Sequence, residues 1–231
     1  MKLPNGGGPE AGRSPRVCVI LSGCGVFDGS EVHEAVIALL ALSRAGAVVR
    51  CAAPDRPQLH VIDHLRGAVA EGESRNVLVE SARIARGQIS ALSEIQADDF
   101  DAVFLPGGFG AAKNLSTFAV AGADATVDAD VARVLKAFRA AGKPIGAVCI
   151  APALLVLALG EGDVTIGNDE STAAAIESMG GHHTSCPVTE VHVDQARRIV
   201  TAPAYMLDAS IADVATGIEA AVRATLDLCE A

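Results

Sequence analysis

Short apolar runs alternate with longer segments of helical periodicity along most of the chain. Four runs are typical of buried strands, at 16–21, 47–53, 102–105 and 144–148. Turn residues or proline follow the first three, and the fourth runs straight into Cys149 and a helix. Apolar residues at helical spacing predict helices over 31–45, 75–85, 111–119, 128–141, 151–159, 172–179 and 210–228. Weaker patterns predict short strands at 58–65, 87–92 and 165–167, and a hairpin of strands 188–193 and 198–201.

This alternation predicts an α/β fold, in which a mostly parallel sheet is sandwiched between helices. Residues 1–15 combine Gly, Pro and polar side chains, so we expect a disordered N-terminal extension and then a single domain over 16–231. Ligands of such folds collect beyond the carboxyl ends of the strands. Three segments with unusual composition are expected there: SGCGVFDGSE, PGGFGAAKN and AVCIAPA.

Composition narrows the function classes. The formal net charge is −10 and the basic residues are scattered, which argues against nucleic acid as a partner. The apolar runs are too short to span a bilayer, so we expect no membrane partner. The six cysteines form no CxxC pair and no zinc-binding spacing with His, and the Gly/Pro-rich start does not resemble a secretory signal. We therefore expect a reduced, cytoplasmic protein in which Cys18 and Cys51 belong to the core.

In AVCIAPA, an apolar strand is followed at once by a helix of small residues, with Cys149 between them. A side chain at such a turn points out of the sheet beside the helix N-terminus, where backbone N–H groups favour a thiolate and lower the thiol pKa. Nucleophile elbows use the same geometry. The alternative is that Cys149 simply ends a buried strand, and spacing alone does not separate the two.

PGGFGAAKN favours the nucleophile. A strand that ends in Pro-Gly-Gly exposes backbone amides, which can bind an anion or a developing oxyanion. The run lacks the Lys-Ser/Thr of a P-loop and the spacing of a dinucleotide site. In DGSE, Ser30 or Asp28 is predicted to cap the next helix and Glu31 to lie in its first turn, which is also ordinary helix-start chemistry.

Together these segments resemble a known family. SGCGVFDGSEVHEA, APDRPQLHVIDHL, RNVLVESARIARG, LPGGFGAAKNLS, CIAPALL, TIGNDESTA, CPV and TAPAYM follow one another as in the ElbB family, from about Val17 to the C-terminus. That family, also called enhancing-lycopene-biosynthesis or sigma cross-reacting protein, belongs to the PfpI/ThiJ superfamily. The resemblance implies a flavodoxin-like, class I glutamine amidotransferase-like fold and a homodimer. Its link by name to isoprenoid synthesis identifies no reaction.

The resemblance also implies site residues. It makes Cys149 the nucleophile, with Glu31 close enough to hydrogen-bond the thiol and with oxyanion donors from the backbone of Gly108 and Ile150. His183 and Asn114 are possible supporting residues around that site. His33, on the first predicted helix, is a further candidate, although each His is equally consistent with a packing role.

The activity implied is that of a glyoxalase without glutathione, metal or other cofactor. Cys149 would attack a small aldehyde, glyoxal or methylglyoxal, and the product would be a 2-hydroxy acid. The alternatives are a protein or nucleotide deglycase, and a redox-sensing or regulatory protein with a reactive cysteine. Ile150 follows the nucleophile where many superfamily members have His, which disfavours amidotransferase or peptidase activity.

Overall fold

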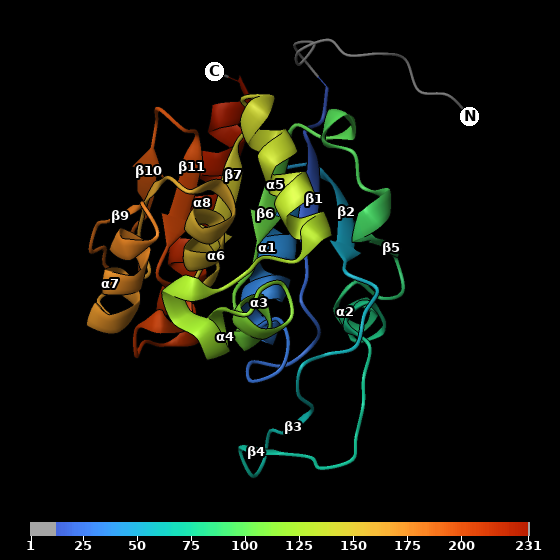
Figure 1. Ribbon diagram of the computed structural model, residues 1–231. Helices are drawn as coiled ribbons and strands as arrows, with labels where there is room; N and C mark the ends of the chain where they lie inside the picture. The colour runs from blue at the N-terminus through green and yellow to red at the C-terminus, as the bar shows by residue number, and fades with distance from the viewer. Residues whose placement is uncertain (1–12, 231) are drawn as a thin grey trace.

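A seven-stranded sheet forms the centre of the molecule, in the order β10–β11–β7–β6–β1–β2–β5. The computed structural model describes residues 13–230 and is shown in Figure 1. Six strands are parallel, and only β10 is antiparallel to its neighbour β11. Their bounds are β1 Arg16–Ile20, β2 Val48–Ala53, β5 Ile89–Ala91, β6 Ala102–Leu105, β7 Ile145–Val148, β10 His192–Asp194 and β11 Ile199–Ala202.

Helices cover both faces of this sheet (Figure 1). One face carries α1 Val32–Arg44, α2 Val77–Ile84 and α8 Ile211–Glu230. The other carries α3 Phe109–Lys113, α4 Phe118–Ala121, α5 Ala129–Ala140, α6 Ala151–Leu159 and α7 Glu170–Ser178. Short 3₁₀ turns complete the connections, at η1 Leu92–Glu94, η2 Ala97–Asp99, η3 Gly122–Asp124 and η4 Ala204–Met206.

The core lies on both sides of the sheet because successive strand residues point to opposite faces. In β1, Cys18 and Ile20 pack with the α5–α6 layer, whereas Val17 and Val19 pack with the α1–α8 layer. Strands buried on both faces need continuous apolar runs, which explains the pattern of the sequence. Cys18 and Cys51 are buried core residues, as predicted.

Four predicted elements differ from the structure. Only Ile62–Asp63 of the predicted strand 58–65 is a strand (β3), and it pairs with β4 Ala68–Val69 in a hairpin that lies away from the main sheet (Figure 1). The predicted strand 165–167 is displaced to β8 Asp163–Val164, which pairs with β9 His182–His183. The second strand of the predicted hairpin is β11, but its first strand is limited to β10.

Tertiary contacts explain the other two differences. The segment before β10 leaves the sheet plane to cross α8, where the Val188 carbonyl lies against Gly217. The predicted helix 111–119 is divided into α3 and α4 because Ser116 pairs with Val127 in an isolated bridge. Residues 1–12 of the predicted disordered extension lie outside the described residues, and Arg13, which follows them, forms an ion pair with Asp101 at 2.7 Å.

The strand order reverses between β1 and β6. The chain leaves β1 toward β2 and β5 on one side, then returns to form β6 on the other side. The loops that follow β1 and β6 meet at the carboxyl edge of the sheet, where the Gly110 N–H donates to the Gly29 carbonyl at 2.8 Å. Open α/β sheets bind ligands at this edge. No helix within residues 13–230 is long and apolar enough to cross a membrane.

Candidate active site

Cys149 occupies the sharp turn between β7 and α6, as the sequence predicted. Its φ is +62°, a left-handed conformation that non-glycine residues rarely adopt and that costs on the order of 1–3 kcal/mol. The Cys149 N–H donates to the Ala202 carbonyl at 3.0 Å, which anchors the turn to the neighbouring strand β11. The side chain is buried, with 7% of the residue exposed. Backbone strain of this kind at a buried cysteine is typical of functional turns.

Two glycines after β6 let the backbone approach this turn. A Cβ on Gly107 would overlap the Cys149 side chain, lying 2.9 Å from its Sγ. Gly108 has a φ of +94° and abuts the N-terminus of α1. The N–H groups of Gly108 and Ile150 hydrogen-bond the Cys149 sulfur. The structure thus brings together three of the predicted site residues, Cys149, Gly108 and Ile150.

The carboxyl group that interacts with the thiol is that of Glu34, which the sequence analysis did not name, and the role expected of Glu31 stays a prediction. Glu31 is the N-cap of α1, where its Oε2 accepts from the Glu34 N–H at 2.7 Å. It therefore caps the helix itself, in place of Ser30 or Asp28. Glu34 is fully buried, and its carboxylate accepts from the N–H of Gly107 at 2.9 Å and of Tyr205 at 3.2 Å.

The face of α1 that packs on the sheet explains why Glu34 escaped the sequence analysis. The larger apolar residues Val32, Val36 and Leu40 look like the core face, yet all three are exposed. The buried face consists of Glu34, Ala35, Ala38, Ala41 and Leu42. Small side chains let α1 approach the sheet and α8 closely. A glutamate at helical spacing with a stripe of alanines was the available signal.

Cys149 and Glu34 form a pair that disfavours a second negative charge. Burial raises the pKa of Glu34 to about 7, and the nearby Glu31 charge adds to the effect. Burial and then the Glu34 charge raise the pKa of Cys149 well above its usual range, against the two N–H groups that lower it. The expected lowering of this thiol pKa is therefore not observed. Near neutral pH the thiol is therefore protonated and Glu34 is partly ionised, so the ionised form of Glu34 can accept the thiol proton.

The sulfur faces a cavity of about 240 Å³. Its walls come from the loops after β1, β6, β7 and β11 and from the start of α7, and the lining residues are Val26, Glu31, Gly108, Phe109, Cys149, Ile150, Asp169, Tyr205 and Met206. The lining is largely apolar around the thiol, with carboxylates and a phenol as its polar groups. The cavity has room for a small organic molecule beside the sulfur.

Tyr205 connects the cavity to His33. The Tyr205 backbone N–H binds Glu34, and its hydroxyl lies 3.0 Å from His33 Nδ1. The same His33 nitrogen lies 4.0 Å from Glu31 Oε1. His33 therefore sits behind two lining residues without lining the cavity itself. Sequence reasoning missed Tyr205 because TAPAYM lies far from the other motifs in the chain.

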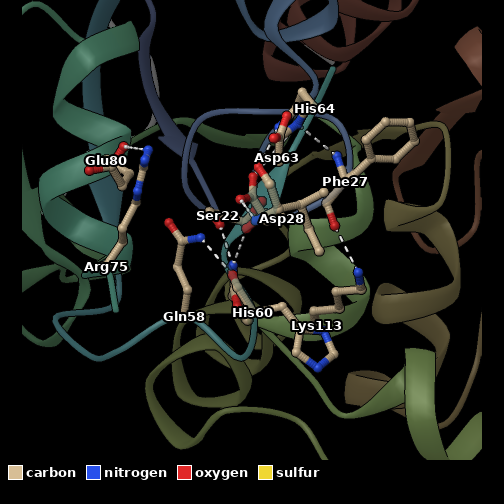
Figure 2. A network of polar contacts seen from close by, with 12 residues as sticks. Ser22, Phe27, Asp28, Gln58, His60, Asp63, His64, Arg75, Glu80 and Lys113 are labelled. Carbon is tan, nitrogen blue, oxygen red and sulfur yellow. Dashed lines mark hydrogen bonds and ion pairs between the residues drawn. The ribbon is translucent and has the colours of Figure 1, made fainter. Parts of the chain in front are cut away.

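Asn114 is buried and supports the loop after β1. Its Nδ2 donates to the carbonyls of Ser22 and Asp28, both at 2.8 Å, and its Oδ1 accepts from the Leu59 N–H. Figure 2 shows Ser22 and Asp28 within this polar network, with side chains of the 58–64 segment around them. The Asp28 carboxylate accepts from the Ile62 N–H at 2.8 Å. Asn114 thus fixes the loop that leads into Glu31 and does not line the cavity.

His183 is also outside the residues that line the cavity. Its Nε2 accepts from the Ile166 N–H at 3.3 Å, and burial lowers its pKa, so a neutral ring bridges β9 to the segment after β8. The structure gives it a packing role. Among the described residues, no group of three or more His, Cys, Asp or Glu side chains is placed to hold a metal ion.

Comparison with known proteins agrees with this architecture. The chain is 52% identical over 222 residues to the human "Glutamine amidotransferase-like class 1 domain-containing protein 3, mitochondrial", covering 92% of this chain and 83% of that one. It also resembles the crystal structure of an isoprenoid biosynthesis protein with amidotransferase-like domain from Ehrlichia chaffeensis. That match has a TM-score of 0.88 and 39% identity, and covers 93% of this chain and 99% of that one.

A more distant structure shares the fold alone. Drosophila melanogaster DJ-1beta matches with a TM-score of 0.53 at 18% identity, over 94% of this chain and 97% of that one. The DJ-1/PfpI family itself matches residues 16–204, which contain the strand-to-helix turn, the double glycine and the buried glutamate. The chain therefore belongs to the DJ-1/PfpI family, which includes enzymes with a catalytic cysteine.

Proposed function

We propose that this protein is a glutathione-independent glyoxalase of the ElbB type, which converts glyoxal or methylglyoxal to a 2-hydroxy acid through Cys149. One observation carries the proposal: the Cys149 thiol lines a small cavity, two backbone N–H groups bind its sulfur, and a buried carboxyl group with a pKa of about 7 lies beside it. These are the nucleophile, the proton carrier and the oxyanion donors that the reaction needs.

The first step is attack of the Cys149 sulfur on one aldehyde carbon. A new C–S bond forms as the carbonyl π bond opens, and Glu34 accepts the thiol proton. A carboxyl group whose pKa lies near ambient pH is well matched to this task. The N–H groups of Gly108 and Ile150 stabilise the negative charge on oxygen, and Glu34 then returns the proton to give a neutral hemithioacetal.

The second step moves hydrogen within the substrate. Glu34 removes the C–H proton from the carbon bonded to sulfur to give an enediolate, and then returns it to the neighbouring carbon. The hydroxyl proton of the first carbon moves to the oxygen of the second. The first carbon is oxidised to a thioester while the second is reduced to an alcohol, so the electrons balance without a redox cofactor. Water then hydrolyses the thioester to glycolate, or to lactate from methylglyoxal, and the thiol is regenerated.

The direct test is formation of glycolate from glyoxal, followed by ¹H NMR. Cys149→Ser keeps the size of the side chain but removes the nucleophile, and turnover should fall by at least about 10³-fold. Cys229→Ser is the matched control, because Cys229 lies on α8 remote from the cavity, and it should retain the wild-type rate. Wild-type turnover by a folded Cys149→Ser variant would refute the proposal.

The second candidate function is a redox sensor based on the same sulfur. The observation in its favour is that a carboxyl group that is partly protonated near neutral pH and two N–H donors surround Cys149, since these groups also suit the oxygens of a sulfinate. Mass spectrometry after mild peroxide treatment tests this. Selective sulfinic acid at Cys149, together with negligible glyoxal turnover, would favour the sensor over the enzyme.

A further inference from the structure

Two carboxylates from different helices face the Cys149 cavity. Glu31 caps α1 and is buried, with one carboxylate oxygen bound to the Glu34 N–H. Asp169 caps α7, where its Oδ1 accepts from the Thr172 N–H at 2.7 Å and from the Ser171 hydroxyl. Hydrogen bonds from Thr172 lower the pKa of Asp169, so this carboxylate is ionised at neutral pH. Both negative charges belong to the lining of the cavity.

No positive charge balances them in the cavity wall. Of the described residues, those that line this cavity include no Lys or Arg. Lys113 is the cation beside the Phe109 wall, 5.3 Å from the ring centroid, but its ammonium donates to the Phe27 carbonyl at 2.8 Å. His33 does not line the cavity, although its Nδ1 lies 3.0 Å from the Tyr205 hydroxyl and 4.0 Å from Glu31 Oε1. An anion that approaches the sulfur therefore meets two carboxylates with no ion-pair partner among the lining residues.

We propose that Glu31 and Asp169 make this cavity a charge filter, which admits uncharged and ammonium-bearing carbonyl compounds and excludes anionic ones. Asp169 is the specificity-determining residue at the start of α7, and Glu31 adds to it from the start of α1. As a statement about substrates, the filter rests on the proposed function. As a statement about which molecules reach the sulfur, it stands on the cavity alone.

The chemical consequence is a preference among small aldehydes of similar size. Glyoxal and methylglyoxal are uncharged, whereas glyoxylate carries a carboxylate beside its aldehyde. In a partly desolvated cavity, repulsion from two carboxylates disfavours such an anion both at entry and when bound. The filter thus directs the thiol to uncharged dicarbonyls and away from 2-oxo acids.

The experiment compares two alkylating agents at the same sulfur. Iodoacetamide is neutral and iodoacetate is an anion of similar size, and peptide mass spectrometry reports the rate of each at Cys149 in the full chain. Because both reagents need the same thiolate, the ratio of the two rates cancels the thiol pKa. The reference is the same ratio for 2-mercaptoethanol, which has no neighbouring charge.

The ratio of iodoacetamide to iodoacetate rates at Cys149 should exceed the reference by about tenfold at low salt and shrink in about 0.5 M KCl. Asp169→Asn keeps the helix cap and should lower this ratio by about threefold. The double variant, which also carries Glu31→Gln, should have a ratio within about twofold of the reference. Glu170→Gln is the matched control, because it removes the same charge from a neighbouring residue that does not line the cavity, and it should change the ratio by less than about 1.5-fold.

A wild-type ratio equal to the reference would overturn the filter, as would equal effects of Asp169→Asn and Glu170→Gln. Resistance of Cys149 to both reagents would also overturn it, since the sulfur would then face no space open to small molecules. The two proposals fail separately. Charge selection without glyoxal turnover leaves the filter and removes the glyoxalase, whereas turnover without charge selection does the reverse.

Discussion

Two hollows among the described residues lie at opposite ends of the sheet, and the smaller one contains the candidate nucleophile. The larger, about 420 Å³, lies at the amino end of the sheet, where residues before β1 and β6 meet α1 and α8. Charged side chains line it, and they form exposed ion pairs such as Arg44 with Glu219 at 2.9 Å. The Cys149 cavity, about 240 Å³, lies at the carboxyl end, and the buried Glu34 carboxyl group lies beside the thiol that faces it.

Each hollow also contains a cysteine, and the contrast between them is instructive. Cys229 lies in a regular helix, burial raises its pKa to about 11, and its Sγ donates to the backbone carbonyls of Asp101 and Thr225. Cys149 lies in a left-handed turn with a proton acceptor and two N–H donors around the sulfur. Volume therefore does not locate a reactive site. A reactive site is identified by backbone strain, by close approach of two backbone segments and by a buried charge. The fold stabilises these features only where many tertiary contacts meet.

The largest loss of activity is expected from Glu34→Gln, which tests the proton acceptor that distinguishes Cys149 from Cys229. The amide keeps the shape of the side chain but cannot accept the thiol proton, so glyoxal turnover should fall by about 10² to 10³-fold. Steady-state kinetics measure this, with circular dichroism to verify folding. Glu31→Gln is the comparison variant, because its amide oxygen still caps α1, and its turnover should fall by less than about tenfold. A greater loss in Glu31→Gln than in Glu34→Gln would reverse the assignment of the two glutamates.

The raised pKa of Glu34 also predicts how stability depends on pH. Between its usual pKa and about 7, the folded state binds a proton that the unfolded chain has lost, so the free energy of unfolding decreases as pH rises through this window. The loss from this group is on the order of 3 kcal/mol by pH 8. Urea denaturation in the wild type should show about 2 kcal/mol of this decrease between about pH 5.5 and 8. A Glu34→Gln variant should lack most of it, and an unchanged slope would contradict the buried-proton interpretation.

The smallest effect on stability and turnover is expected from a substitution in the larger hollow. Glu219→Gln removes the exposed partner of Arg44 and should change the free energy of unfolding by less than about 1 kcal/mol. Glyoxal turnover should stay at the wild-type rate, because this end of the sheet contributes nothing to the Cys149 cavity. A clear loss of turnover would show that changes in the larger hollow affect the Cys149 cavity, and it would contradict the contrast between the two hollows.

Local pattern determined much of the architecture. Apolar runs and helical periodicity predicted β6 and α6 over their observed residues, and β1, β2, β7, α1, α5 and α8 to within a few residues. The strand-to-helix step in AVCIAPA predicted the turn at Cys149, and Pro-Gly-Gly predicted exposed amides beside it. These features follow from neighbours in the chain, because backbone preference and burial period act over a few residues.

Tertiary structure decided the chemistry of the site. Which face of α1 is buried depends on how closely its alanines approach the sheet and α8, so only the fold identified Glu34 as the partner of the thiol. Asp169 and Tyr205 reach the same cavity from segments distant in sequence. The pKa of the thiol moved opposite to the local expectation, because burial and a neighbouring carboxylate outweigh helix N–H groups once the packed sheet excludes water.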